Sequence, residues 1–276
     1  VRSPVGPPAG GGGGPMRLTI VGCAGSLAGP DSPASSYLIQ TRDSSGRLWS
    51  IAMDMGSGAF GALQSILPPE ALDFVGLSHL HPDHCADLTG LAVYAKYRPG
   101  AAMDSLPVYG PADTPHHLAE LRYSHDPQSD GGDFNYGSWS PGVGVSVGPF
   151  NITPFTVAHP VEAWGFRIEG PSDITPGKRV TLSYSGDTDT CEGLTELAAG
   201  ADLLLVEAAF EERRDIARGV HLTGRRAGQV ARAARARHVV VTHLPPWNDP
   251  AITLDALGQV YSGPVYLARQ RASYAI

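Results

Sequence analysis

The sequence predicts an α/β protein in which two β-sheets pack face to face and helices cover the outside. With 276 residues, 42% of them hydrophobic, the chain can bury a sizeable core. Short β-branched and aromatic runs, bounded by Gly, Pro, Ser or Asp, recur in both halves of the sequence. Segments with apolar residues at helical spacing follow the runs in each half, and the halves are not copies of one another.

The first half of the folded chain begins at Met16. Residues 1–15 (VRSPVGPPAGGGGGP) contain no aromatic residue and almost nothing to bury, so we expect a disordered tail there and a single domain over 16–276. The runs that follow predict strands at 18–23, 36–41, 49–56 and 74–77, the last leading into a His-rich loop. Apolar residues at helical spacing then predict a helix over 87–97.

The remaining elements alternate in the same way. A strand at 107–109 and a helix at 114–122 precede an irregular stretch. Four aromatic residues in this region could pack in the loop, stack a nucleobase or contact a second copy of the chain: Tyr123, Phe134, Tyr136 and Trp139. The second half is expected to have strands at 151–158, 164–169, 180–185, 201–206 and 238–242, with helices at 192–199 and 223–234.

Charge and cysteine content exclude several classes of function. Against 27 Asp and Glu the chain has 20 Lys and Arg, and its net charge of −7 argues against binding the phosphate backbone of duplex DNA. Cys23, Cys85 and Cys191 are too far apart for a disulfide framework or a Cys-x-x-Cys zinc site. No apolar run approaches the roughly 20 residues that span a bilayer. We therefore expect a cytoplasmic protein that does not enter the membrane and acts on a small substrate.

The segment SHLHPDHCADL carries the strongest indication of chemistry. It places His79, His81, Asp83 and His84 within six positions, directly after a predicted strand. Imidazoles at i and i+2 can reach one metal ion, while the carboxylate and imidazole at i+4 and i+5 point to a neighbouring position. Neutral imidazole and carboxylate ligands suit zinc, and ligation without thiols leaves manganese or iron possible. The alternative is a His-rich surface loop.

Three further residues that could bind a metal ion lie at the carboxyl ends of predicted apolar strands: His159, Asp187 and His243. Each alone is more simply a hydrogen-bonded turn residue, but their joint occurrence favours a metal centre. The seven candidates divide into a set of three histidines for one ion and a mixed set for the other, with Asp187 between them. The two sets are His79, His81 and His159, and Asp83, His84 and His243. The sequence therefore predicts two divalent ions per chain, zinc first.

Four features resemble the motifs of the metallo-β-lactamase superfamily. They are the segment HLHPDH, the isolated His159, the Asp of SGDT (Asp187) and the His of VTH (His243). The resemblance spans residues 16 to about 267 and implies a four-layer αββα sandwich with a dinuclear metal site at one edge. Asp187 stands where class B1 lactamases carry Cys, which argues against β-lactam hydrolysis. A bridging carboxylate instead implies the phosphodiesterase, ribonuclease Z or glyoxalase branches.

Finer features resemble the ribonuclease Z branch. The segment IVGCAGSLAGPDSPASSYLI is similar to its Gly-rich N-terminal segment, and LLLVEAAF with GVHLTGRRAG is similar to its Glu-containing strand and His-x-Thr helix start. This resemblance implies that His221 is a catalytic histidine oriented by Glu207. Only 27 residues separate His159 from Asp187, too few for the arm with which the long processing nucleases grip tRNA.

The arm-less chain is most similar to atypical class II cyclic-nucleotide phosphodiesterases, in GCAGS, GPDSPAS, HLHPDHCADLTGL and HPVEAWGFRI. The resemblance implies that Asp83 orients a water for attack on a 3′,5′-cyclic nucleotide, cyclic AMP first, while His221 protonates the leaving 3′-oxygen. The product is a nucleoside 5′-monophosphate, and we expect a homodimer. The alternatives are a ribonuclease Z-like endoribonuclease and a thioesterase or glyoxalase-like hydrolase.

Overall fold

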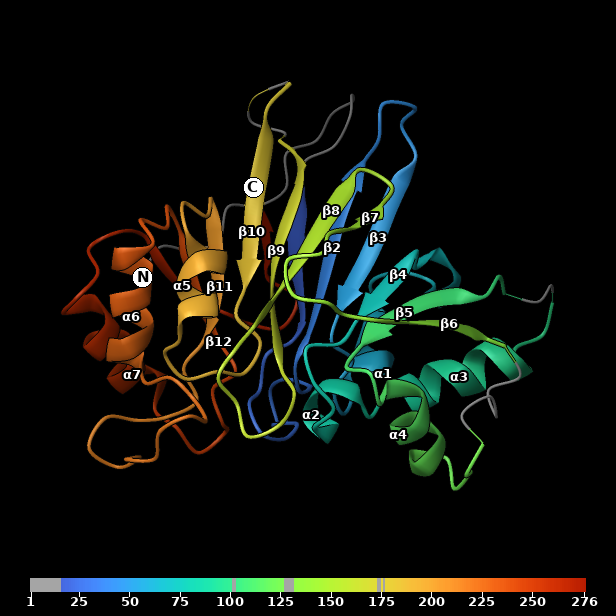
Figure 1. Ribbon diagram of the computed structural model, residues 1–276, viewed down its shortest axis with the longest axis horizontal. Helices are drawn as coiled ribbons and strands as arrows, with labels where there is room; N and C mark the ends of the chain where they lie inside the picture. The colour runs from blue at the N-terminus through green and yellow to red at the C-terminus, as the bar shows by residue number, and fades with distance from the viewer. Residues whose placement is uncertain (1–15, 101–102, 127–131, 173–174, 176) are drawn as a thin grey trace.

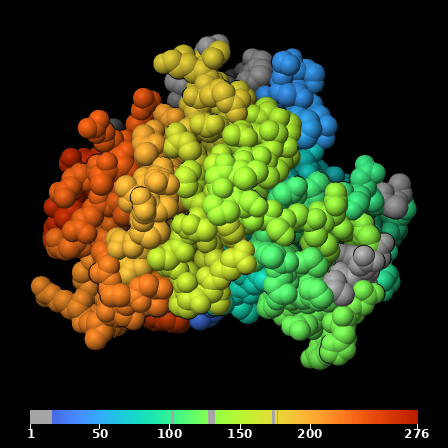
Figure 2. Space-filling model, viewed as in Figure 1, coloured from blue at the N-terminus to red at the C-terminus, as the bar shows by residue number. Residues whose placement is uncertain are grey.

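Two seven-stranded sheets face each other in the computed structural model, and helices lie on both outer sides (Figure 1). The structure describes residues 16–100, 103–126, 132–172, 175 and 177–276, so the tail predicted for residues 1–15 lies outside the described part of the chain. The N-terminal and C-terminal halves of the chain lie against each other along the middle of the molecule (Figure 2). The expected four-layer αββα sandwich is confirmed.

The first sheet has the strand order β14-β1-β2-β3-β4-β5-β6. Strands β1, β2, β3 and β14 pair antiparallel, whereas β3 to β6 run parallel to one another. The strands are β1 (Arg17–Gly22), β2 (Ser36–Arg42), β3 (Leu48–Met53), β4 (Phe74–Gly76), β5 (Leu106–Gly110), β6 (Phe134–Ser138) and β14 (Ser273–Ala275).

The second sheet has the order β13-β12-β11-β10-β9-β8-β7. Strands β7 to β10 are antiparallel, and β10 to β13 are parallel. The strands are β7 (Val145–Val147), β8 (Phe150–Thr156), β9 (Trp164–Pro171), β10 (Arg179–Tyr184), β11 (Leu203–Glu207), β12 (Val239–Thr242) and β13 (Val265–Leu267). The carboxyl ends of the parallel strands of this sheet therefore share one edge.

The helices divide between the two outer faces, as Figure 1 shows. The first sheet carries α1 (Ala59–Leu63), the 3-10 helix Pro69–Ala71, α2 (Pro82–Cys85), α3 (Leu88–Tyr97) and α4 (Thr114–Leu121), and the second carries α5 (Glu192–Ala198), α6 (Gly224–Ala233) and α7 (Pro250–Gly258). Among the described residues, no helix combines the length and apolar character needed to cross a bilayer.

Alternation along the strands builds three apolar layers. In β1, Leu18 and Ile20 face the core between the sheets, while Val21 faces the helices of the first sheet. In β11, Leu205 faces the same central core, and its neighbours Leu204 and Val206 face α5 and α6. Because successive strand side chains point to opposite faces, continuous apolar runs such as LLLV fill two layers at once.

The predicted strands and all four predicted helices are confirmed, with ends that shift by a few residues. The stretch expected to be irregular instead contains β6, which pairs in parallel with β5. Phe134 and Trp139 are buried in the core layers, so the nucleobase-stacking interpretation is wrong for these two residues. Helices α1, α2 and α7 and strands β7, β13 and β14 were not anticipated, since each is short or has a weak period.

Candidate metal centre

The seven candidate residues converge at one edge of the sandwich, where strands from both sheets end. The loop after β4 carries His79 and His81, and α2 follows at once with Asp83 and His84. Pro82 takes the first position of α2, where its missing N–H costs no helical hydrogen bond. Three more residues follow the ends of β8, β10 and β12, namely His159, Asp187 and His243.

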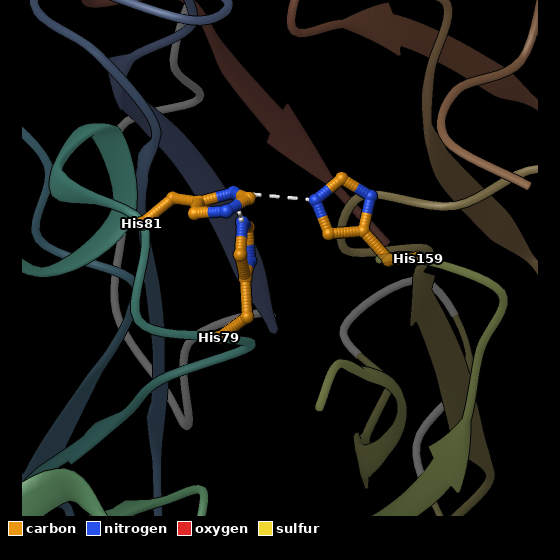
Figure 3. A group of neighbouring side chains, drawn as sticks. All are labelled: His79, His81 and His159. Atoms are coloured by element: carbon orange, nitrogen blue, oxygen red, sulfur yellow. Dashed lines mark hydrogen bonds between the residues drawn. The ribbon is translucent and has the colours of Figure 1, made fainter. Parts of the chain in front are cut away.

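Three histidine rings meet at a single point, drawn from loops of both sheets (Figure 3). His81 Nδ1 lies 3.0 Å from His79 Nε2 and 3.2 Å from His159 Nε2. A zinc ion with Zn–N bonds of about 2.0 to 2.1 Å in a tetrahedral site spaces its ligand nitrogens about 3.3 Å apart. Both distances are close to this spacing, and all three ligand nitrogens lie within 4.8 Å of one another.

The same histidines are held in the form that binds metal. His159 Nδ1 donates to the carbonyl of Val220 at 2.8 Å, which leaves Nε2 as a lone pair facing the other rings. His79 Nδ1 lies 3.0 Å from the hydroxyl of Ser78. Burial lowers the pKa of all three imidazoles, most of all that of His79. Neutral rings at neutral pH need lose no proton to a metal ion.

The second set contains buried polar atoms without partners. His84 Nε2, His243 Nε2 and Asp187 Oδ1 are buried and find no hydrogen-bond partner among the described residues. His84 Nε2 lies 3.2 Å from Asp187 Oδ1, and Asp83 Oδ2 lies 3.6 and 3.8 Å from the Nε2 atoms of His84 and His243. Such orphaned groups are costly unless something satisfies them, and a cation between these atoms would do so.

Asp187 lies between the two sets. Its Oδ2 is 3.1 Å from His243 Nε2 in the mixed set and 3.7 Å from His79 Nε2 in the three-histidine set. Burial opposes ionisation of this carboxyl, but the nearby His243 and His84 hold its pKa well below the usual range. The buried His/Asp cluster is compatible with a dinuclear metal site, and Asp187 groups with Asp83, His84 and His243 and also with Glu207 and His221.

Asp54 hydrogen-bonds residues of the candidate metal centre, and the sequence did not predict this role. It follows β3, is fully buried and adopts a φ of 60°, which places its carboxylate under the loop after β4. The carboxylate accepts hydrogen bonds from the backbone and hydroxyl of Ser78 at 2.6 and 2.8 Å, from the Tyr184 hydroxyl at 2.6 Å and from His84 Nδ1 at 2.8 Å. It therefore fixes the tautomer that turns His84 Nε2 toward the mixed set.

A second strained residue completes the mixed set. His243 has a φ of 58°, in the left-handed region that non-glycine residues rarely occupy. The Ser35 hydroxyl lies 3.0 Å from its Nδ1, and a Cβ atom on Gly25 would clash with its carbonyl oxygen. Glycine at position 25 therefore lets the loop after β1 pack against His243, whose Nε2 lies 3.1 Å from Asp187 Oδ2.

His221 and Glu207 lie together beside the candidate metal ligands. His221 Nδ1 is 2.8 Å from Glu207 Oε1 and 4.0 Å from Asp187 Oδ2. Burial lowers the His221 pKa, but the charge of Glu207 and its hydrogen bond outweigh burial and raise that pKa to about 9. Glu207 is fully buried and is held by the backbone N–H groups of Thr188 and Ala209. The imidazole is thus an acid with a fixed orientation.

A cavity of about 320 Å³ opens over the centre. Asp83 and His221 both line it. The other lining residues are candidate ligands and their loop neighbours: Ser26, His81, Pro82, His159, Pro160, Asp187, Val220 and His243. No Lys or Arg stands among the described residues that line it. The cavity therefore presents ligand nitrogens, two carboxylates and one cationic imidazole to whatever binds there.

Known proteins resemble the chain in sequence and in fold. Residues 53–244 match the family model of the Beta-lactamase superfamily domain. An uncharacterized protein of Mycobacterium tuberculosis is 38% identical, over 91% of this chain and 89% of its own length. Ribonuclease Z of Haloferax volcanii is 24% identical over 92% of both chains. The crystal structure of the metallo-beta-lactamase fold protein YhfI from Bacillus subtilis matches with a TM-score of 0.79 at 28% identity, over 94% of this chain and 98% of that one. The chain therefore belongs to the beta-lactamase superfamily, as a relative of metallo-hydrolases and of ribonuclease Z.

Proposed function

We propose that the chain is a dinuclear metal-dependent phosphodiesterase that hydrolyses 3′,5′-cyclic nucleotides, cyclic AMP first, to nucleoside 5′-monophosphates. The observation that carries the proposal is the His221–Glu207 pair, in which His221 lines the cavity and has its Nδ1 4.0 Å from Asp187 Oδ2. A metal centre alone would serve many hydrolases. An oriented acid beside it serves a reaction whose leaving group must gain a proton.

The proposed ligands form two sets. His79, His81 and His159 would hold one ion, and Asp83, His84 and His243 the other. Asp187 would be shared, because its Oδ2 lies 3.1 Å from His243 Nε2 and 3.7 Å from His79 Nε2. Zinc is the first choice, and manganese or iron is possible. When bound, two such ions lower the pKa of a water and neutralise charge on a phosphoryl group.

The protein's own groups supply orientation and proton transfer. Asp83 lines the cavity, and its carboxylate can accept a hydrogen bond from the attacking water and so direct it toward phosphorus. His221, with its pKa raised to about 9, is protonated at neutral pH and can donate to the 3′-oxygen as that oxygen departs. Glu207 stabilises the imidazolium before transfer and keeps Nδ1 occupied, which leaves Nε2 for the substrate.

A small substrate is favoured over RNA. The cavity holds about 320 Å³, its described lining has no Lys or Arg, and the chain carries a net charge of −7. An RNA track would need cationic side chains along the phosphate backbone. A ribonuclease Z-like endoribonuclease is the second candidate, because the ribonuclease Z relative and the His221–Glu207 pair both fit it. A thioesterase or glyoxalase-like hydrolase would have no use for this pair.

The proposal extends to a cytoplasmic homodimer. All three cysteines are free, which suits a reducing compartment. Val93 and Tyr97 on α3 and Tyr123 after α4 leave apolar surface exposed, and a second copy could cover it. A solution mass of one chain by light scattering would contradict the dimer.

A panel of substrates tests the function. Protein reconstituted with zinc or manganese is assayed on cyclic AMP, cyclic GMP, 2′,3′-cyclic AMP, a precursor tRNA and a thioester, with Asp187→Ala as the metal-deficient control. We expect cyclic AMP to give 5′-AMP at the highest kcat/KM, and Asp187→Ala to be inactive on every compound. Turnover confined to RNA or to the thioester would contradict the proposal.

A further inference from the structure

We propose that Asp189 is a positioning residue that places both His159 and His221, by anchoring the segment 218–221 against the metal centre. The inference rests on the proposed function, because it takes these two histidines as a metal ligand and a proton donor. Asp189 itself touches neither the cavity nor a proposed ligand side chain. Its effect would pass through the backbone of the loop between β11 and α6.

Asp189 is a buried carboxylate that is saturated with donors. Its side chain is 3% exposed. Oδ2 accepts from the backbone N–H of Gly219 and from Arg218 Nε, both at 2.8 Å. Oδ1 accepts from the backbone N–H of Thr190 at 2.7 Å and from Arg226 Nη1. Charge-assisted bonds of this kind are the strong ones, so the carboxylate fixes the groups that it contacts.

The segment anchored by Asp189 carries two contacts to the centre in consecutive residues. Directly after Gly219, the carbonyl of Val220 accepts the proton of His159 Nδ1 at 2.8 Å. The next residue is His221, whose Nδ1 faces Glu207. A shift at Gly219 would therefore disturb the tautomer of His159 and the aim of His221 together.

The backbone of Asp189 and the preceding residue Thr188 are also hydrogen-bonded to residues beside the centre. Its backbone N–H donates to the carbonyl of Ala158 at 2.8 Å, next to His159. The preceding Thr188 accepts from the N–H of Ala158 at 3.0 Å and donates its own N–H to Glu207 Oε1 at 2.8 Å. The three residues from Asp187 onward thus join the loop of His159, the strand of Glu207 and the segment before His221.

Burial does little to hold the first part of this segment in place. Residues 216–219 are exposed, with Ile216 at 87%, so the chain up to Gly219 has little apolar surface packed against the core. A segment with few buried contacts opens locally at low cost unless hydrogen bonds tie it down. The bond from Gly219 to Asp189 and the salt bridge from Arg218 are such ties.

Asp189→Asn tests the inference with a change of one atom. The amide keeps the size of the side chain but puts an NH₂ where a carboxylate oxygen received two N–H groups. We expect kcat on cyclic AMP and the affinity for zinc each to fall about 10- to 100-fold, as for outer partners of metal ligands, with KM changed less than threefold. Arg218→Ala removes one tie from an exposed side chain, and we expect a smaller loss in the same direction.

Asp202→Asn is the matched control. Asp202 also bonds an arginine, Arg237 Nη1 at 2.9 Å, and a backbone N–H, that of Thr181 at 2.9 Å. It precedes β11, at the opposite end of that strand from Glu207. A merely structural effect of losing a carboxylate should appear in both variants, whereas loss of positioning should appear only at Asp189.

The deciding readouts use metal-free protein, so they do not depend on any activity. In wild type, ¹⁵N spectra should show His159 as the Nδ1–H tautomer and slow exchange of the Gly219 amide. Asp189→Asn should give mixed tautomers and amide exchange at least 10-fold faster, with Asp202→Asn unchanged. Wild-type spectra in Asp189→Asn, or equal changes in the two variants, would overturn the inference. If wild type hydrolyses no phosphodiester, the proposed function fails, but these readouts still judge the role of Asp189.

Discussion

Replacing His221 with alanine should separate proton donation from metal binding. Glu207 outweighs the effect of burial and raises the His221 pKa to about 9. At pH 7 the imidazole of the metal-free protein is therefore mostly protonated. Removing a positioned general acid costs about 10²- to 10⁴-fold in kcat. At 1.36 kcal/mol per factor of ten, this is about 2.7 to 5.4 kcal/mol of transition-state stabilisation.

The assay compares two leaving groups on the same metal-loaded enzyme. Cyclic AMP should show the full loss, because its 3′-oxygen departs as an alkoxide unless it is protonated. Bis(p-nitrophenyl) phosphate should show much less, since p-nitrophenolate leaves without a proton. Metal content should stay at the wild-type value, and the exposed His238→Ala should change neither rate. An equal loss on both substrates would refute proton donation, and a loss of metal would place His221 among the ligands.

Three further changes probe the centre. Asp187→Ala removes the carboxylate between the two sets, so metal content by elemental analysis should fall to at most one ion per chain; two retained ions would refute the bridge. Glu207→Gln should return the pKa of His221 in metal-free protein from about 9 toward 6.5, by NMR. Because the raised pKa stabilises the fold at low pH, the wild-type free energy of unfolding should decline as pH rises from 6.5 through about 9, and the variant should lack this decline. Asp54→Asn leaves His84 Nδ1 without its anionic acceptor, and competition with a chelator should show zinc affinity about 10- to 100-fold weaker. Unchanged affinity would mean that Asp54 serves the fold alone.

The seven candidate ligands were predictable from the sequence for a physical reason. Four of them, His79, His159, Asp187 and His243, follow short apolar runs, and the ends of neighbouring strands meet at one edge of a sheet. Asp187 and His243 follow β10 and β12, which lie on either side of β11 and run parallel to it. The apolar runs that predict these two strands therefore also indicate that the two residues lie close together. The motif around His79 predicts the remaining ligands, which lie after β4 of the first sheet.

The supporting residues were not predictable in the same way. Asp54 follows a predicted strand, but one Asp in the run AMDMG gives no sign that its partners are Ser78 and Tyr184, 24 and 130 positions away. Arg226 pairs with Asp189, 37 positions distant, and nothing in the helical pattern around it indicates that partner. Such contacts depend on the register of strands and on loop closure, which hydrophobic periodicity does not encode.

Anomalous diffraction from crystals of the metal-loaded protein tests the dinuclear centre most directly. Data collected at the zinc edge should show two peaks per chain, about 3.5 to 4 Å apart, the spacing of two-metal sites. One peak should contact the three histidines of Figure 3, the other should contact Asp83, His84 and His243, and Asp187 should touch both. A single peak, or two peaks of which only one contacts Asp187, would contradict the account.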